Sequence, residues 1–358
     1  MRVRFMSNRF WVRLGLLLWA AVLSVAPLSA APTAAPNPRI VAIGDLHGDY
    51  AAWRDIALAA GLIDASGRWI GGTTQLVQAG DVADRGPDTL KIIQDLMRLQ
   101  REAARAGGRV YALVGNHEAM NMTDDLRYVS AAEYAAFADR KSAARRSQIF
   151  DLNEVAIEAA YRKDKPSMSS EAIRDAWYAA TPLGKIEHQT AWHPDGKIGS
   201  WIIRNPAVLL LDGTIFVHGG ISAAYAARPI AEINRSVAAA LTTRDTAPEA
   251  IINDQSGPLW YRGLVADQRE AAEDATLPAP VAPMTVEAEL EQVLAAYGAK
   301  RLVIAHTPIL SGIAILYGGR LIRIDTGISA VYGGKPSYLE IVDGVPVAHV
   351  VARSAVAR

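Results

Sequence analysis

The chain of 358 residues contains no cysteine. It therefore forms no disulfide bond and binds no metal ion through thiolates. It is also neither a lipoprotein anchored through an N-terminal cysteine nor a phosphatase that uses cysteine as its nucleophile. Any metal-binding or catalytic site in this chain must be built from oxygen and nitrogen groups.

The chain also lacks an excess of charge of either sign, since it has 37 lysine and arginine residues and 37 aspartate and glutamate residues. Proteins that bind nucleic acid through its phosphates usually carry a basic excess, so we expect no nucleic-acid partner. Hydrophobic residues make up 51% of the chain and charged residues 21%. This composition predicts a folded domain with a sizeable core.

Apolar runs long enough to cross a membrane are missing too. The run Leu14–Val25 is shorter than the roughly 20 residues that a membrane-spanning helix needs. Small residues follow it at Ser29–Ala31, and four basic residues precede it: Arg2, Arg4, Arg9 and Arg13. This order predicts a signal peptide at residues 1–31, hence a periplasmic or secreted protein without stable membrane insertion after cleavage. The alternative is an uncleaved signal that anchors the protein to a membrane.

From Arg39 onward, short apolar runs alternate with stretches of helical periodicity. The pattern predicts strands and helices in alternation, at Ile40–Ile43, Asp49–Ala60, Thr74–Ala79, Asp88–Ala106 and Arg109–Val114. Three strands joined by helices are typical of an α/β fold with a largely parallel sheet. Ligands of such sheets bind at the carboxyl ends of the strands.

The rest of the chain predicts a helical insertion followed by more strands. Residues 119–200 are alanine-rich with helical spacing, and we expect them to form an insertion beside the site within one domain over residues 39–358. Later strands are expected at Ile198–Arg204, Ala207–Leu211, Thr214–Val217 and Arg301–Ala305. A Pro/Ala-rich linker is expected at residues 276–283, and tight turns in the tail predict a second, mostly antiparallel sheet.

Metal-ligating side chains follow the expected strands, most of them beside glycine. Asp45 and His47 follow the first strand, Asp81 the second and Asn116 the third, and His218 and His306 end two later ones. Carboxylate, carboxamide and imidazole groups suit divalent ions such as Mn, Fe or Zn, and the sequence leaves the choice open. The six residues predict two metal ions about 3.5–4 Å apart, with Asp81 as the natural bridge.

The motifs resemble those of the calcineurin-like metallophosphoesterases, and within them the phosphoprotein phosphatases. The similar stretches are Gly44–Gly48, Gly80–Gly86, Gly115–Glu118, His218–Gly220 and His306. Further stretches resemble the Shewanella-like phosphatases: Asn116–Met122, Arg127–Val129, Leu259–Gly263 and Ile324–Ser329. The resemblance implies a four-layer α/β/β/α sandwich with a helical insertion.

The resemblance also implies a role for each residue. Asp45, His47 and Asp81 would hold one ion, and Asp81, Asn116, His218 and His306 the other. Pro308 replaces a further histidine of many relatives, so the first ion would keep fewer protein ligands.

The same resemblance implies the catalytic groups. His117 would be the general acid, and Asp84 would hydrogen-bond its other ring nitrogen. Arg85, Asn116 and Arg262 would bind the substrate phosphate, although the run Trp260–Arg262 could instead be a packed surface strand.

Other polar residues receive lesser roles. We expect His188 and His193 to be polar surface or capping residues, and His349 to be structural. Asp325 is expected to stabilise a turn or to orient a metal-binding histidine. Glu118 is expected to support the site without touching a substrate.

These features predict a two-metal phosphomonoesterase in which a metal-bridging hydroxide attacks phosphorus directly. The expected substrates are proteins phosphorylated on tyrosine or on serine and threonine, or a small phosphoester. The alternative is a nucleotide or dinucleoside polyphosphate hydrolase with the same site. A catalytically inactive scaffold would have lost ligands, whereas all of those expected here are present.

Overall fold

The computed structural model describes residues 39–265 and 284–354. The predicted signal peptide at residues 1–31 and the predicted linker at residues 276–283 lie outside these described residues. Among the described residues, no helix is long and apolar enough to cross a membrane.

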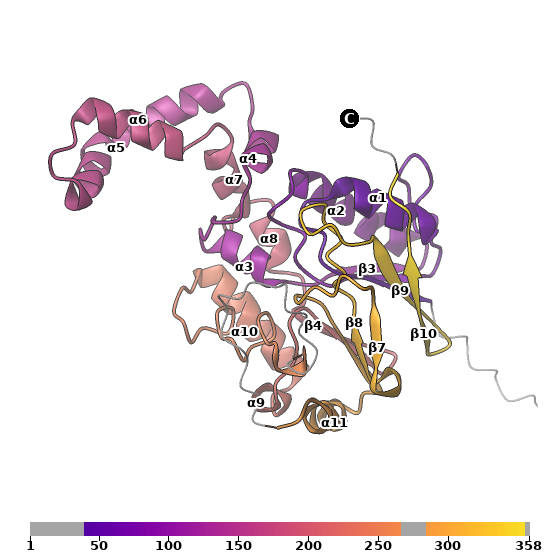
Figure 1. Cartoon of the computed structure of the whole chain (residues 1–358). Coiled ribbons are helices and arrows are strands. Elements are labelled where there is room, and N and C mark those ends of the chain that lie inside the picture. Colours follow the sequence, from indigo (N-terminus) through magenta and orange to yellow (C-terminus); the bar gives the residue numbers. More distant parts are fainter. Residues whose placement is uncertain (1–38, 266–283, 355–358) are drawn as a thin grey trace, which may run out of the picture. The chain divides into compact units, whose positions relative to one another are not determined.

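Two five-stranded sheets form the centre of the described part of the chain (Figure 1). The first has the order β10-β9-β1-β2-β3, with β1 (Ile40–Ile43), β2 (Gln75–Gln78) and β3 (Arg109–Ala112) parallel to one another. The second has the order β4-β5-β6-β8-β7. Its strands are β4 (Val208–Leu211), β5 (Thr214–Val217), β6 (Arg301–Ile304), β7 (Ala314–Leu316) and β8 (Leu321–Arg323).

Successive residues of the central strands face opposite layers. In β1, Ile40 and Ala42 belong to a hydrophobic cluster that both sheets share, whereas Val41 and Ile43 belong to the cluster that includes the helices. Strands that are buried on both faces are hydrophobic at every position, and all four residues of β1 are buried. The α/β class with two packed sheets is therefore confirmed.

Helices cover the outer faces of the sheets. Helices α1 (Tyr50–Ala59) and α2 (Thr89–Arg105) pack against each other, and α2 packs on β3. Helix α10 (Ile230–Thr243) packs on β4 and α11 (Val286–Tyr297) on β6. Figure 1 shows both pairs flanking the sheets. The short α9 (Ala223–Ala226) contacts α11, while the 3-10 turns η1 (Gly263–Val265) and η2 (Tyr317–Gly319) complete the helical elements.

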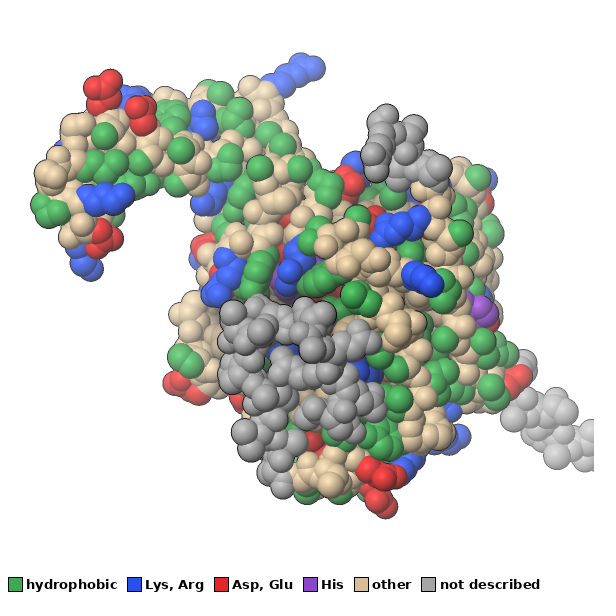
Figure 2. Space-filling view, in the orientation of Figure 1, with side chains coloured by type: hydrophobic (Ala, Val, Ile, Leu, Met, Phe, Trp, Pro, Cys, Tyr) green, Lys and Arg blue, Asp and Glu red, His purple; other side chains and the backbone are tan. Residues whose placement is uncertain are grey.

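The helical insertion lies between β3 and β4. Its helices are α3 (Asn116–Met122), α4 (Ala131–Phe137), α5 (Ser142–Asp164), α6 (Ser170–Ala180), α7 (Lys185–Trp192) and α8 (Gly199–Ile202). Helices α5 and α6 form a hairpin that contacts α7 and lies away from the sheets in Figure 1. Figure 2 shows hydrophobic side chains on the visible surface of this hairpin, and Leu152 and Val155 of α5 are 75% and 84% exposed.

The strand predicted at Ile198–Arg204 is wrong, because α8 occupies that stretch. Ile198, Trp201 and Ile202 are buried, and their spacing of three and four residues follows the period of a helix rather than that of a strand. The indole N–H of Trp201 donates to Gln100 Oε1 of α2 at 2.9 Å, which fixes α8 against the helical layer.

The second sheet predicted from the tail is present, but it is mixed rather than mostly antiparallel, and the last two strands of the tail do not belong to it. The hairpin of β9 (Ser337–Val342) and β10 (Val345–Val350) joins the first sheet, where β9 pairs antiparallel with β1. In the second sheet β8 pairs parallel with β6 and antiparallel with β7. The turn residues Asp343 and Gly344 have φ of 50° and 79°, which suits a two-residue hairpin. Turn signals identify such a hairpin but not the distant strand that it pairs with.

Candidate active site

The six predicted metal ligands meet at the carboxyl ends of strands from both sheets. Each is at most 7% exposed: Asp45, His47, Asp81, Asn116, His218 and His306. The first four follow β1, β2 and β3 of one sheet, and the two later histidines follow β5 and β6 of the other. Residues far apart in the chain thus gather in one buried polar site.

Two groups of potential ligands share Asp81. His47, Asp81 and His117 form one group and Asp81, His218 and His306 the other, with one ligand atom of each residue within 4.8 Å of the others in its group. Asp81 Oδ2 lies 3.9 Å from His47 Nε2 and 3.2 Å from His218 Nε2. A carboxylate common to both groups is what a bridged pair of ions requires.

Asp45 and Asn116 extend the two groups. Asp45 Oδ2 lies 3.9 Å from His47 Nε2, and Asn116 Oδ1 lies 2.9 Å from His218 Nε2. Both predicted ligand sets are therefore assembled. His117, predicted as an acid, shares the first group with His47 and Asp81.

The histidine tautomers suit metal binding. His47 Nδ1 lies 2.9 Å from the carbonyl of Ala83, and His218 Nδ1 lies 2.9 Å from that of Ala79. A carbonyl only accepts hydrogen bonds, so each Nδ1 carries the proton and leaves the Nε2 lone pair facing Asp81. Burial, followed by the nearby His117, lowers the pKa of His47 to about 3. The imidazole is thus neutral, as a metal ligand must be.

The buried acids suit bound cations as well. Burial raises the pKa of Asp45, and the neighbouring charges of Asp325 and Asp81 raise it further. His306 Nε2 and Asp325 Oδ2 are buried without a hydrogen-bond partner. Divalent ions would offset the accumulated negative charge and satisfy donor atoms that are otherwise unpaired. The residues present therefore fit two divalent ions held by oxygen and nitrogen.

The loops at the strand ends are conformationally strained. Five non-glycine residues here have positive φ: His47 (41°), Asp81 (53°), Asp84 (72°), Arg85 (67°) and His306 (69°). Such angles are uncommon for residues with a Cβ atom, and they cluster where the surrounding structure holds functional groups in place.

Glu118 holds two of these loops together. Its carboxylate accepts hydrogen bonds from the backbone N–H groups of Asp81 (2.8 Å), Val82 (2.9 Å), Ala83 (3.2 Å) and Gly115 (2.8 Å). A Cβ atom on Gly115 would lie 2.2 Å from Asp81 Oδ1, so only glycine fits beside the shared carboxylate. The supporting position expected for Glu118 is the one that the structure shows.

His117 is held by a chain of buried hydrogen bonds. Its Nδ1 lies 2.5 Å from Asp84 Oδ2, and its Nε2 lies 3.8 Å from Asp81 Oδ2. Burial alone would lower the pKa of His117, but the carboxylates of Asp81 and Asp84 outweigh burial and raise it. The side-chain amide of Asn121 donates to Asp84 Oδ1 and to the carbonyl of His117, both at 2.9 Å. Sequence reasoning missed Asn121; its position four residues after His117 on one helix was the available signal.

The two predicted phosphate-binding arginines lie on different loops. The guanidinium carbon of Arg85 lies 4.8 Å from the ring centroid of Tyr128 and 4.9 Å from that of Tyr332. Arg262 lies in a turn immediately before η1 rather than in a strand. Burial lowers the pKa of His306, and the positive charge of Arg262 lowers it further.

The remaining polar residues show one further error. His188, expected at the surface, is fully buried beside Glu133, with 3.9 Å between His188 Nε2 and Glu133 Oε1. Asp325 accepts a hydrogen bond from the N–H of Gly327 and interacts with Asp45. His349 stacks on Tyr338 with 4.6 Å between ring centroids.

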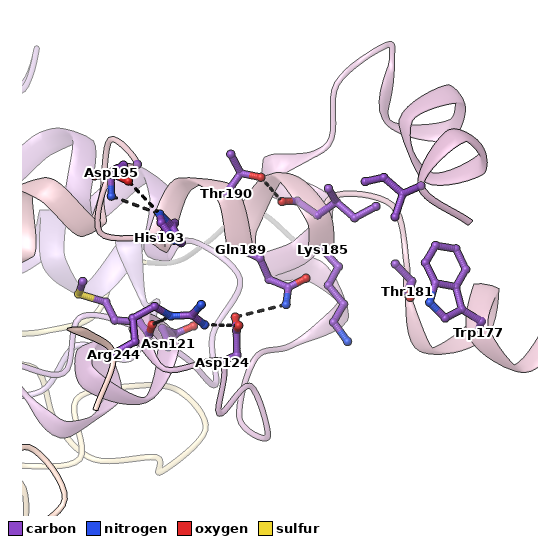
Figure 3. A pocket seen from close by; sticks show the side chains of 14 residues that line it. Asn121, Asp124, Trp177, Thr181, Lys185, Gln189, Thr190, His193, Asp195 and Arg244 are labelled. Carbon is purple, nitrogen blue, oxygen red and sulfur yellow. Dashed lines mark hydrogen bonds and ion pairs between the residues drawn. The ribbon is translucent and has the colours of Figure 1, made fainter. Parts of the chain in front are cut away.

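A cavity of about 690 Å³ adjoins the site on the side of the insertion (Figure 3). Its lining includes Asn121, Trp177 and Gln189. Asp124 links two residues of the cavity wall, because its carboxylate contacts both Gln189 and Arg244 (Figure 3). Asn121 thus lines the cavity and also donates a hydrogen bond to His117, the predicted acid. The predicted metal ligands do not line the cavity.

Several proteins that are similar to this chain in sequence or in structure are named as phosphatases. The model of the calcineurin-like phosphoesterase family matches residues 38–334. Over 318 residues the chain is 35% identical to Shewanella-like protein phosphatase 2 of Arabidopsis thaliana, covering 85% of the chain and 75% of the relative. It is 29% identical to Shewanella-like protein phosphatase 1 of Plasmodium berghei, covering 86% of the chain and 72% of the relative. The structure of a cold-active protein-tyrosine phosphatase from a psychrophilic Shewanella species has a TM-score of 0.60 at 22% identity, covering 88% of the chain and 81% of that structure.

The chain belongs to the calcineurin-like phosphoesterase family. Its predicted similarity to the Shewanella-like protein phosphatases is confirmed. Members of this family use two divalent metal ions, and the protein is a metal-dependent phosphatase with the His and Asp groups to hold them.

Proposed function

We propose that the protein hydrolyses phosphate monoesters on proteins, with phosphotyrosine as the preferred residue. The observation that carries the proposal is Asp81, shared by two groups of ligands and lying beside a histidine that is paired with a second carboxylate. A phosphoprotein substrate is supported by the sequence similarity to a Shewanella-like protein phosphatase and by the structural similarity to a protein-tyrosine phosphatase.

The residues around the ligands would divide the chemistry between them. When bound, two divalent ions supply positive charge for the phosphoryl oxygens and an activated water at neutral pH. Asp45, His47 and Asp81 would hold one ion, and Asp81, Asn116, His218 and His306 the other. His117 would then donate a proton from Nε2 to the leaving oxygen, because Asp84 holds Nδ1 and orients the ring.

The phosphate itself requires fixed donors. Arg85 and Arg262 would bind the phosphoryl oxygens, since a guanidinium group donates two parallel hydrogen bonds to them, and Asn116 would contribute its side-chain amide. Asn121 and Glu118 touch no substrate in this scheme. They hold Asp84, His117 and the loop of Asp81 in position.

A substrate panel tests the proposal. Phosphotyrosine peptides, matched phosphoserine peptides, p-nitrophenyl phosphate and a dinucleoside polyphosphate would be assayed after chelation and after addition of Mn, Zn or Fe. We expect metal-restored hydrolysis that is fastest on phosphotyrosine. Faster turnover of the dinucleoside polyphosphate would overturn the proposal in favour of nucleotide hydrolysis.

We also propose that the protein is exported. The support is the basic, apolar and small-residue order of residues 1–31. N-terminal sequencing of the protein purified from cell fractions would test this. A chain that starts near residue 32 in the periplasm or medium is expected, whereas an intact N-terminus in the membrane fraction would favour the anchored alternative.

A further inference from the structure

Two tyrosines enclose the side chain of Arg85. The guanidinium carbon lies 4.8 Å from the ring centroid of Tyr128 and 4.9 Å from that of Tyr332. These distances are within the range of a cation–π interaction on each ring. The N–H of Arg85 also donates to the carbonyl of Tyr128 at 2.9 Å, so backbone and side chain are tied to the same residue.

Each tyrosine also contacts one histidine of the site. The Tyr128 ring lies 5.1 Å from the ring of His117, and the Tyr332 ring lies 5.6 Å from that of His47. The five side chains form a closed ring of contacts in the order His117, Tyr128, Arg85, Tyr332, His47, because the rings of His47 and His117 also lie 4.7 Å apart. Arg85 is thereby linked through one tyrosine to the predicted acid and through the other to a predicted metal ligand.

One hydrogen-bond donor of Arg85 has no partner among the described residues. Its Nε atom is buried and has no hydrogen-bond partner. Buried donors are almost always paired, and an unpaired one indicates a ligand or a functional constraint. Since both tyrosine rings lie within 5 Å of the guanidinium carbon, we take its unpaired N–H edge to be the part that meets an oxyanion.

We propose that Tyr128 and Tyr332 are positioning residues that hold the N–H edge of Arg85 toward the substrate phosphate, and that Tyr128 also favours aryl leaving groups. The inference rests on the proposed function. It assigns a role to Tyr128, which lies in the stretch Arg127–Val129. This stretch contains none of the predicted metal ligands.

The preference for aryl groups follows from the position of Tyr128. This side chain is 36% exposed and contacts His117, which would protonate the leaving oxygen. A phenol that leaves phosphorus and takes its proton from His117 would therefore lie near the Tyr128 ring, and two aromatic rings attract each other. The leaving group of phosphoserine has no ring for this contact. Tyr332 is next to His47 instead, so it would hold Arg85 without affecting the leaving group.

Binding of inorganic phosphate to the metal-loaded protein tests the positioning role without turnover. Titration calorimetry would compare the wild type with Tyr128→Phe, Tyr128→Leu, Tyr332→Phe and Tyr332→Leu. We expect each Leu variant to weaken phosphate binding by about 3–10-fold and each Phe variant to bind as the wild type does, since the ring provides the interaction. Tyr178→Leu is the matched control, because this tyrosine also stacks on an arginine, Arg146 at 4.5 Å, but lies in α6.

A double-mutant comparison separates positioning from a general structural effect. In an Arg85→Ala background, Tyr128→Leu and Tyr332→Leu should weaken phosphate binding no further. Additive losses, or Leu variants that bind phosphate like the wild type, would overturn the positioning role. If a Leu variant melts well below the wild type, the corresponding Tyr→Gln variant replaces it.

Substrate preference tests the second half of the inference. The ratio of kcat/KM for phosphotyrosine to that for matched phosphoserine peptides should fall about 2–10-fold in Tyr128→Leu and stay constant in Tyr332→Leu. Equal ratios in both variants would overturn the role of Tyr128 in selecting aryl groups. A wild type that binds phosphate but hydrolyses no phosphopeptide would contradict the proposed function instead, while the calorimetry would still decide the role of the rings.

Discussion

His117 Nδ1 lies 2.5 Å from Asp84 Oδ2, and both side chains are buried. The contact leaves Nε2 of the imidazole facing Asp81, 3.8 Å away. An imidazole in this position can serve as a proton donor or as a ligand of the first ion. The two roles predict different consequences when His117 is replaced.

Replacement of His117 should slow the reaction without loss of metal. We expect His117→Asn to lower kcat by roughly 10²–10⁴ on phosphoserine peptides and by less on p-nitrophenyl phosphate, whose leaving group needs no protonation. Steady-state kinetics with both substrates measures this difference. Asp84→Asn is the companion variant and should show the same leaving-group pattern. Elemental analysis that finds one ion fewer in His117→Asn would instead identify the residue as a ligand.

Metal removal should destabilise the protein. Ions that bind only the folded chain stabilise it by about 2.7 kcal/mol when the free ion is 100-fold above its dissociation constant. Thermal melting after chelation should therefore give a lower Tm, restored by adding the ion. His218→Ala should lose this response, whereas His193→Ala, an exposed histidine outside the ligand groups, should retain it. An unchanged Tm in chelated wild type would contradict metal binding at these residues.

Glu118 should contribute to stability through its four backbone hydrogen bonds. Glu118→Gln keeps the shape of the side chain but directs an amide NH₂ group at backbone donors. We expect the free energy of unfolding to fall by about 1–3 kcal/mol, because buried donors lose their acceptor. Denaturant unfolding measures the loss. Glu102→Gln is the control, since among the described residues this more exposed glutamate accepts one backbone N–H, from Trp69, and pairs with Arg98. A loss no larger than that of the control would contradict the supporting role.

Stability should decrease with pH because of Glu133. Burial raises the pKa of this carboxyl from 4.5 to about 8, so between these values the folded chain keeps a proton that the unfolded chain releases. The free energy of unfolding contributed by this group is therefore fully present below pH 4.5 and is lost as pH rises toward 8. Burial likewise lowers the pKa of the adjacent His188 to about 3, so His188 stays neutral throughout this range.

Glu133→Gln isolates this effect, since glutamine cannot titrate. The variant should gain stability relative to the wild type between pH 6 and pH 9, by an amount on the order of a few kcal/mol at most. Urea unfolding at several pH values compares the two chains. Parallel stability curves would show that Glu133 is ionised in the folded protein at neutral pH.

The sequence predicted which residues gather at the site because each follows a strand that a local apolar pattern reveals; their role as metal ligands stays a prediction. Apolar runs ending at Gly44, Gly80 and Gly115 mark three adjacent strand ends, and chemistry indicates what Asp45, Asp81 and Asn116 do there. The error at Ile198–Arg204 has the opposite cause, since a short buried helix and a buried strand are equally apolar. His188 was misplaced because its burial depends on how α4 and α7 pack, which no local pattern records.

The sequence also could not predict which distant strands pair with each other or which aromatic rings contact Arg85. The tail hairpin pairs with β1 at the opposite end of the chain, and a strand pattern carries no information about its partner. Tyr332 lies beyond the stretch at Ile324–Ser329 that resembles relatives. Its contact with Arg85 depends on a loop conformation that residue types alone do not determine.

The ligands of the site come from both sheets, and the sheets are held apart by one layer of side chains. That layer includes Phe216 of β5 and Leu339 of β9, both fully buried. Its packing fixes how the two sheets lie against each other, and therefore how Asp81 of one sheet lies relative to His218 and His306 of the other. Because protein interiors are close-packed, we expect a change of side-chain volume in this layer to displace the residues of the site.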